Sequence, residues 1–233
     1  MTIIIGFNLG SCILLAADTR TTCYGKNGTE TYYDESEKIQ KTKFGIITGA
    51  GAITLLDPVK KRMAEDPITN TDDMLKIIRE ERKIIMKTYS NHQKPSKQIL
   101  SGTGWLFSYP TIIEETPCLR LCVYHPSLGD DLGIYEEGRV AVIAPAEATV
   151  NEAEGISDIL QETIKMDFNN GNIENIFLYY HPIISTAIKT LNPKYKSISE
   201  HVQYGIHTID NRYGITRIIK EIDKSFSLTL NTF

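Results

Sequence analysis

The stretch TIIIGFNLGSCILLAADTR, residues 2–20, contains two apolar, β-rich runs separated by a short break. The runs cover residues 3–8 and 12–17, and the Asn8-Leu9-Gly10 break between them is typical of a hairpin turn. Thr2 leads directly into the first run, although chain ends normally fray unless a sheet holds them. Thr2 stands at this position either by chance or because its own amino group is exposed, held in place by the strand and used.

The composition is that of a globular protein with enough apolar residues for a substantial core. The chain has 233 residues, of which 41% are hydrophobic and 23% are charged. Domains commonly have roughly 100–200 residues and sheet-rich ones often exceed that, so we expect residues 1–233 to form a single domain. Its 25 basic and 29 acidic residues give a net charge of −4. This balance argues against a nucleic-acid partner, because phosphate binding depends on clustered Lys and Arg.

Neither a membrane segment nor a secretory signal is indicated. No apolar run approaches the length of a membrane span, and no basic stretch precedes the first apolar run. Cys12, Cys23, Cys118 and Cys122 form no CxxC pair, so free thiols are the expected state. The five histidines show no metal-binding spacing. These features predict a cytoplasmic protein without a metal site.

The order of predicted elements is strands, two helices, strands, two helices, strands. After the first hairpin, extended chain is expected over 21–33 with a turn at Asn27-Gly28, followed by a strand pair over 38–48 that ends at the small residues 49–51. The remaining predictions are helices over 53–66, 72–91, 150–167 and 173–191, and strands over 103–109, 119–125, 131–138, 139–144, 200–210 and 214–223. This order predicts an α+β fold in which two packed sheets carry helix pairs on their outer faces.

Thr2 is the first candidate for chemistry. A threonine hydroxyl is a weak nucleophile until a base takes its proton. Once Met1 is removed, as it commonly is before small residues, that base can be the α-amine of Thr2, whose reference pKa is about 7.7–8.0. A threonine paired with its own N-terminal amine is an established nucleophile and base.

Three further residues complete a possible catalytic set. Asp18 closes the second apolar run, Lys38 begins the next predicted strand, and Gly51 precedes the first helix. A lysine beside Thr2 would lower the pKa of its hydroxyl, and an aspartate would orient that lysine. The peptide N–H around Gly51 would stabilise an oxyanion. Taken singly, Asp18 fits a strand-end ion pair and Lys38 a solvated charge; taken together, they favour amide hydrolysis.

These motifs resemble those of the proteasome-type N-terminal nucleophile hydrolases. The family opens with Thr, a short apolar stretch and Gly, as in residues 2–6 here. Its D-x-R motif corresponds to Asp18-Thr19-Arg20, and its lysine followed by an apolar residue corresponds to Lys38-Ile39. Its small turn before the first helix corresponds to Ala50-Gly51, with Gly49 as an alternative. The motif resemblance covers residues 2–60, and beyond that the order of elements carries it.

The resemblance implies a four-layer αββα sandwich and a threonine-type hydrolase activity that cleaves peptide or amide bonds. Peptides or unfolded proteins would be the substrates, and no metal or organic cofactor would be needed. Relatives enclose their active sites in rings, so the resemblance implies a homo-oligomer, served in some cases by an ATPase unfoldase. The family also often carries a supporting serine before a late strand, for which Ser199 is the candidate.

The sequence departs from the family pattern in one loop. The family usually has a serine in a Gly-Ser-Gly loop before the third helix, but residues 142–149, VIAPAEAT, contain neither serine nor glycine, and Thr149 stands far along the stretch. The departure leaves two alternatives open. One is a non-catalytic ring or scaffold protein of the same fold, which a retained Met1 would also produce. The other is an amidase acting on a small molecule.

Overall fold

The computed structural model describes residues 2–25, 27–91, 93–166, 173–216 and 228–232. The helices of that part are α1 (Ile53–Glu65), α2 (Thr71–Thr88), α3 (Gln93–Ser101), α4 (Val150–Glu162) and α5 (Ile173–Leu191), with a short 3₁₀ turn at Pro126–Leu128. The strands are β1 (Ile4–Asn8), β2 (Cys12–Asp18), β3 (Thr21–Tyr24), β4 (Glu30–Tyr33), β5 (Gln40–Lys41), β6 (Ile46–Ala50), β7 (Gly104–Ile113), β8 (Thr116–Tyr124), β9 (Gly133–Tyr135), β10 (Arg139–Ile143), β11 (Val202–Thr208), β12 (Arg212–Ile215) and β13 (Asn231–Thr232).

Two large antiparallel sheets form the centre of the molecule. One has the order β10-β1-β2-β11-β12-β13 and the other β5-β6-β7-β8-β9, while β3 and β4 pair as a separate ribbon. The first sheet joins the opening hairpin to strands near both the middle and the end of the chain, because β1 pairs with β10 and β2 pairs with β11. The hairpin register places Ile4 opposite Ala17, as the two apolar runs predict.

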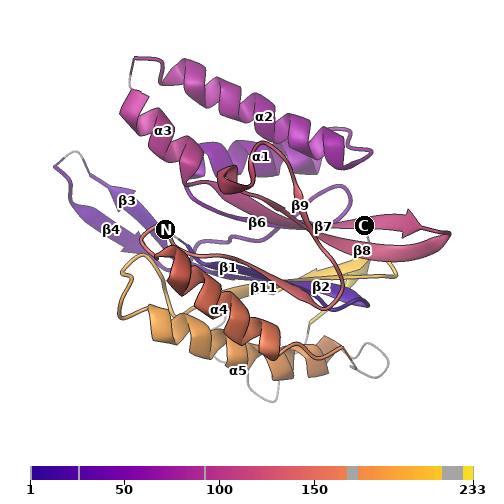
Figure 1. The fold of residues 1–233 in the computed structure, drawn as a ribbon. Coiled ribbons are helices and arrows are strands. Elements are labelled where there is room, and N and C mark those ends of the chain that lie inside the picture. The colour runs from indigo at the N-terminus through magenta and orange to yellow at the C-terminus, as the bar shows by residue number, and fades with distance from the viewer. Residues whose placement is uncertain (1, 26, 92, 167–172, 217–227, 233) are drawn as a thin grey trace.

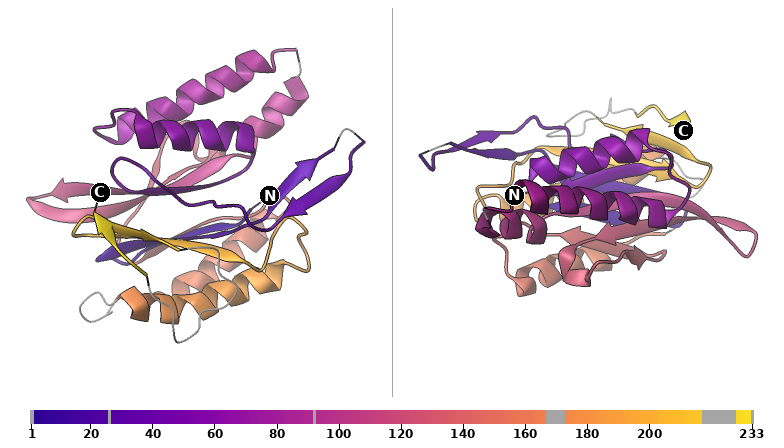
Figure 2. Two further views of the ribbon diagram at one scale, coloured as in Figure 1. Left: turned by 180° about the vertical axis from the view of Figure 1, so that it is seen from behind. Right: turned by 90° about the horizontal axis from the view of Figure 1, so that it is seen from above.

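Helices cover both outer faces of the sheets. Figure 1 shows α1, α2 and α3 over the five-stranded sheet and α4 and α5 over the six-stranded sheet, and the views in Figure 2 show the same layers. The layers are therefore helix, sheet, sheet, helix. This arrangement confirms the predicted α+β fold and the αββα sandwich.

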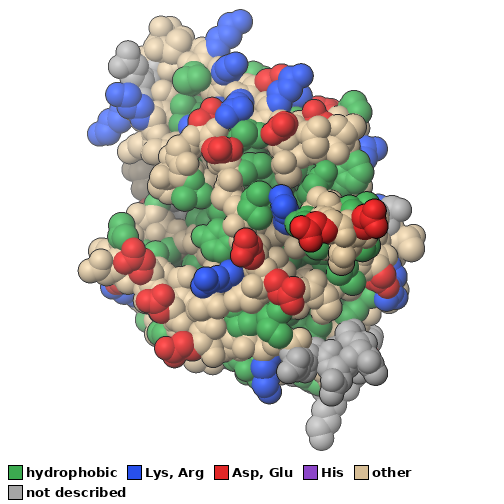
Figure 3. Space-filling view, turned by 45° about the vertical axis from the view of Figure 1, so that its right-hand side comes forward, with side chains coloured by type: hydrophobic (Ala, Val, Ile, Leu, Met, Phe, Trp, Pro, Cys, Tyr) green, Lys and Arg blue, Asp and Glu red, His purple; other side chains and the backbone are tan. Residues whose placement is uncertain are grey.

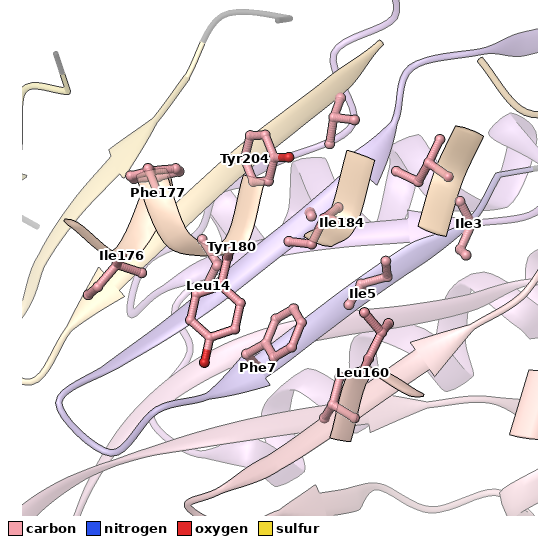
Figure 4. Packing of buried hydrophobic residues seen from close by; sticks show 14 of the residues in the cluster. Ile3, Ile5, Phe7, Leu14, Leu160, Ile176, Phe177, Tyr180, Ile184 and Tyr204 are labelled. Atoms are coloured by element: carbon pink, nitrogen blue, oxygen red, sulfur yellow. The ribbon is translucent and has the colours of Figure 1, made fainter. Parts of the chain in front are cut away.

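Strand β1 is buried on both faces, which explains its unbroken apolar run. Ile3, Ile5 and Phe7 pack into the core that α4 and α5 cover, where Figure 4 shows them with Tyr180, Ile184 and other apolar side chains. Ile4 points the opposite way and belongs to the core between the two sheets. The two sheets therefore hold Thr2, two residues before β1, at a fixed place in the molecule.

The two sheets approach each other closely at Gly6. A Cβ atom at this position would lie 2.9 Å from Cδ1 of Leu121, on β8 of the other sheet. A side chain at residue 6 would therefore require the opposite sheet to shift, and glycine fits the space.

Some sequence predictions differ from the structure. The prediction missed α3, whose short, polar sequence includes Pro95, and it extended α4 beyond Glu162. The strand expected over 214–223 ends at Ile215 as β12, and the part from 217 on lies outside the described residues. Lys38 does not begin a strand, because β5 starts at Gln40. Lys38 instead lies in an irregular segment, so its backbone groups depend on side chains as partners.

The surface carries charges of both signs. On the face shown in Figure 3, acidic and basic side chains are interspersed, and hydrophobic side chains reach the surface between them. Within the described ranges, no helix has the length and apolar character needed to cross a bilayer.

Candidate active site

Thr2 and Lys38 are in direct contact in a buried site. Thr2 is 4% exposed and Lys38 is 8% exposed. The Nζ atom of Lys38 donates to Oγ1 of Thr2 at 3.2 Å. The hydroxyl of Thr2 donates a hydrogen bond to the main-chain oxygen of Arg20, with Oγ1 at 3.4 Å from it. The threonine oxygen therefore faces a cation, as activation of a hydroxyl requires.

The ammonium of Lys38 has two other hydrogen-bond partners. Nζ donates to the main-chain oxygen of Arg20 at 2.9 Å and to Oγ1 of Thr21 at 3.2 Å. Burial lowers the pKa of Lys38, while the negative charges of Asp18 and Asp57 raise it. These three acceptors fix the direction of the ammonium.

Asp18, at the end of β2, is fully buried and binds three main-chain N–H groups. Oδ1 accepts from Ile3 at 2.9 Å, and Oδ2 accepts from Arg20 at 3.0 Å and from Ser199 at 3.1 Å. Burial raises the pKa of Asp18 to about 6, against the charge of Lys38 and these N–H donors, which lower it. Among the described residues, no hydrogen bond or ion pair joins Asp18 to Lys38. Asp18 instead reaches the Thr2 region through its hydrogen bond from the N–H of Ile3.

Ser199 enters the site through its backbone. Its N–H binds Asp18, while its hydroxyl accepts from the N–H of Thr19 at 3.2 Å and donates to the main-chain oxygen of His201 at 3.1 Å. The Ser199 side chain therefore holds the D-x-R segment in place.

Arg20 ties this segment to two neighbouring parts of the chain. Its guanidinium pairs with Asp34 through both carboxylate oxygens and donates to the main-chain oxygen of Lys196 at 2.7 Å. It also lies over the ring of Tyr32, 5.2 Å from its centre. The guanidinium thus binds Asp34 and Lys196, while the main-chain oxygen of Arg20 accepts from Thr2 and Lys38.

Gly51 lies at the turn between β6 and α1. Its φ of +128° is a conformation that glycine favours. An added Cβ would lie 2.4 Å from Oγ1 of Thr103 and 2.6 Å from the main-chain oxygen of Gly102. In the part of the chain described here, no hydrogen bond links Gly51 to Thr2, Asp18 or Lys38. The structure thus brings together four of the five predicted residues and places Gly51 at the predicted turn.

Gln203 is a site residue that the sequence does not single out. Its side chain is buried on β11, and Oε1 accepts from the backbone N–H of Lys38 at 2.6 Å and of Ile39 at 2.8 Å. Nothing near Gln203 in the sequence indicates this contact, because it depends on the distance between β11 and the segment before β5. The one available signal is a glutamine between Val202 and Tyr204 in a predicted strand.

The loop before α4 provides no replacement for the family's serine. Thr149 caps α4: its hydroxyl accepts from the N–H of Glu152, and Glu152 accepts in return from Thr149. Across the described ranges, no group of three His, Cys, Asp or Glu side chains could hold a metal ion.

Comparisons with known proteins identify the fold. No protein-family model matches the chain, and no curated protein matches its sequence. Among solved structures, a mutant Anbu from Hyphomicrobium sp. strain MC1 aligns with a TM-score of 0.58 at 14% identity, covering 94% of this chain and 86% of that chain. Anbu (ancestral beta-subunit) from Yersinia bercovieri aligns with a TM-score of 0.57 at 11% identity, covering 89% and 82%.

A third match is the helical assembly of the Anbu complex from Pseudomonas aeruginosa. It aligns with a TM-score of 0.59 at 11% identity and covers 89% of this chain and 81% of that chain. At these identities the likeness shows the fold alone. The chain has the proteasome-like, N-terminal nucleophile hydrolase fold of the Anbu proteins, as the resemblance implies.

Proposed function

We propose that this chain is an N-terminal threonine hydrolase that cleaves amide bonds, with Thr2 as the nucleophile. The observation that carries the proposal is the 3.2 Å contact between Nζ of Lys38 and Oγ1 of Thr2 in a buried site. A lysine with no role at Thr2 would be expected to extend into solvent rather than to contact this buried hydroxyl. The Anbu-like fold supports the proposal, since Thr2 lies two residues before β1, the first strand of the sandwich.

Before catalysis, hydrolysis of the Met1–Thr2 bond releases methionine and frees the α-amine of Thr2. That amine takes the hydroxyl proton as Oγ1 attacks the substrate carbonyl, and Lys38 stabilises the negative charge that develops on Oγ1. The proton then passes to the leaving amine, and an acyl-enzyme ester remains on Thr2. Water attacks the ester with the same amine as base, releases the acid and restores the hydroxyl.

Asp18 acts in this proposal as a positioning residue. By accepting from the N–H of Ile3, its carboxylate fixes the peptide that follows Thr2, and its charge favours the protonated form of Lys38. Ser199 positions Asp18 in turn through its N–H. The N–H of Gly51 is proposed as the oxyanion donor, on the basis of its place at the β6–α1 turn.

Peptides or unfolded proteins are the proposed substrates, and a homo-oligomer with an ATPase unfoldase is the proposed working form. Exposed apolar side chains such as Ile112, Ile159 and Leu178 support subunit contacts. The helical assembly of the Pseudomonas aeruginosa Anbu complex supports self-association of this fold.

We also propose that residues 1–233 form a single domain. The proposed compartment is the cytoplasm, because all four cysteines are free thiols.

One observation favours a second candidate function, a non-catalytic scaffold of the same fold. Thr149 is engaged in capping α4, so the loop before that helix offers no hydroxyl to assist Thr2. A scaffold would assemble as the hydrolase does but would turn over no substrate.

Hydrolysis assays separate these functions. Protein purified without an N-terminal tag is assayed with a panel of fluorogenic peptides and with simple acyl amides, beside the Thr2→Ala variant. Peptide turnover that Thr2→Ala lacks is the expected result. Turnover of acyl amides alone would favour a small-molecule amidase, and an assembled, folded protein inert toward both would favour the scaffold.

A further inference from the structure

Lys60 is a second buried lysine next to the Thr2 site. It lies on α1, which packs on the opposite sheet from β1, and it is 2% exposed. Its Nζ donates to the main-chain oxygen of Lys38 at 2.6 Å. A charged side chain is rarely so deeply buried without a partner that offsets the loss of hydration.

The contact completes a pair of side chains that hold the Lys38 backbone. On one side, Gln203 of β11 accepts from the N–H of Lys38 at 2.6 Å. On the other side, Lys60 of α1 donates to the C=O of the same residue. We call Gln203 and Lys60 the peptide clamp. Because Lys38 lies outside the strands, these side chains replace the partners that a strand ladder would give it.

We propose that Lys60 is a positioning residue for the reaction, which fixes the Lys38 backbone so that its ammonium meets Oγ1 of Thr2. The inference rests on the proposed function, because it gives Lys60 a role only if Thr2 is the nucleophile. The clamp joins opposite layers of the sandwich, with Gln203 from the six-stranded sheet and Lys60 from the outer helix layer. The reach of Lys38 to Thr2 therefore depends on the packing of both layers.

The charge of Lys60 adds a second effect. The charged groups that act on it are Lys38, from the segment before β5, and Asp57, from its own helix. Burial and the charge of Lys38 lower the pKa of Lys60 to about 8, while Asp57 raises it. In its protonated form Lys60 contributes positive potential at the site, which favours ionised Thr2 oxygen and a neutral Thr2 amine.

The test follows the rate at which a β-lactone acylates Thr2 over a range of pH, measured by intact mass. The variants are Lys60→Met, which removes donor and charge, and Lys60→Arg, which keeps both. Lys61→Met is the matched control, because Lys61 is the adjacent, exposed lysine of the same helix. Lys60→Met is expected to react about tenfold more slowly, as loss of a hydrogen bond to a buried acceptor predicts. Below the pKa of Lys60, about 8, Lys60→Arg should react at about the wild-type rate, and Lys61→Met should do so at every pH.

The pH profile separates positioning and charge from a general loss of structure. Without the Lys60 charge the pKa of the Thr2 amine rises, so the acid limb of the Lys60→Met profile should move to higher pH. A merely loosened fold would lower the rate at every pH without moving that limb. A folded Lys60→Met protein with the wild-type rate and profile would overturn the inference.

The remaining outcomes are also decisive. If wild-type Thr2 is not acylated at all, the proposed function fails and the inference fails with it; acylated wild type with an unchanged Lys60→Met profile refutes the inference alone. If Lys60→Met does not fold, Lys60→Arg supplies the test. Arginine stays charged where Lys60 loses its proton, so the rate of Lys60→Arg should hold to higher pH than that of wild type. Identical alkaline limbs would overturn the inference.

Discussion

The main-chain nitrogen of Ile3 lies 2.9 Å from Oδ1 of Asp18, so the carboxylate that ends β2 fixes the peptide that leads into β1. The two other N–H donors to Asp18 come from Arg20 and Ser199, which belong to different parts of the chain. A single buried side chain thereby joins the first strand of the sandwich to the segment before β11. Its loss should affect both stability and the Thr2 site.

Asp18→Asn should destabilise the protein by about 2 to 4 kcal/mol. The amide NH₂ of asparagine would face at least one of the N–H groups that now donate to the carboxylate. Urea unfolding followed by circular dichroism measures the change. Asp210→Asn is the control, since Asp210 makes an exposed pair with Arg212 that is expected to contribute less than about 1 kcal/mol. Equal midpoints for the two variants would show that Asp18 does not hold the site together.

Lys38→Met should reduce peptide hydrolysis by about 100-fold or more, because the substitution removes the cation that faces Oγ1 of Thr2. The apolar side chain of Met is close to Lys in length, so the fold should remain. Steady-state rates and a thermal melt on the same samples check both statements. A folded Lys38→Met variant with wild-type kcat would exclude Lys38 from the mechanism.

Gly51→Ala should destabilise the β6–α1 turn. The φ of +128° is itself unfavourable for alanine, and the new Cβ would lie 2.4 Å from Oγ1 of Thr103. Gly129→Ala separates these causes, because Gly129 also has a positive φ, +82°, but open space around its Cβ position. Thermal melts should show a clearly larger loss for Gly51→Ala. Matching melts would mean that contact with Thr103 is unimportant.

His207 should make the protein sensitive to acid. It is buried between the sheets, with Nδ1 2.8 Å from Oγ of Ser108 and Nε2 3.1 Å from Oδ1 of Asn211. Burial lowers its pKa to about 4, from 6.5. The unfolded chain therefore binds a proton at this residue at higher pH than the folded one, and the contribution of His207 to stability should fall by up to about 3 kcal/mol as pH drops from 6.5 to 4.

The control for this effect is His207→Gln, which removes the titrating ring. As the pH is lowered from 7 to 4, the unfolding free energy of wild type should fall relative to that of the variant, and this difference isolates His207 from the opposite effect of Asp18, whose pKa is raised to about 6. The same slope in both proteins would show that other groups cause the acid sensitivity.

Much of the fold could be predicted from local sequence. The apolar runs around Asn8-Leu9-Gly10 indicate a buried hairpin because strands covered on both faces need apolar residues at successive positions. Thr149 and Glu152 similarly mark the start of α4 by a capping box. The helix α3 could not be found in this way, because its short sequence contains a proline and few apolar residues and gains its order from packing beside α2.

The candidate site likewise contains residues that the sequence indicates and residues that only the structure shows. Thr2, Asp18 and Lys38 occupy sequence positions that chemistry and a family pattern can single out. Gln203 and Lys60 act on the backbone of Lys38 from distant elements, so only the packed structure shows their contacts. The sequence also predicts that Asp18 orients Lys38, whereas its hydrogen bonds are to backbone N–H groups.

The most direct test of the central claim is the mass of untagged protein before and after reaction with a peptide epoxyketone. This reagent forms its stable ring only with a hydroxyl and a neighbouring free amine. We predict a starting mass short by one methionine, a single added equivalent mapped to Thr2, and no adduct on Thr2→Ala. A full-length mass with no adduct would contradict the account, because Thr2 would then lack the amine that serves as its base.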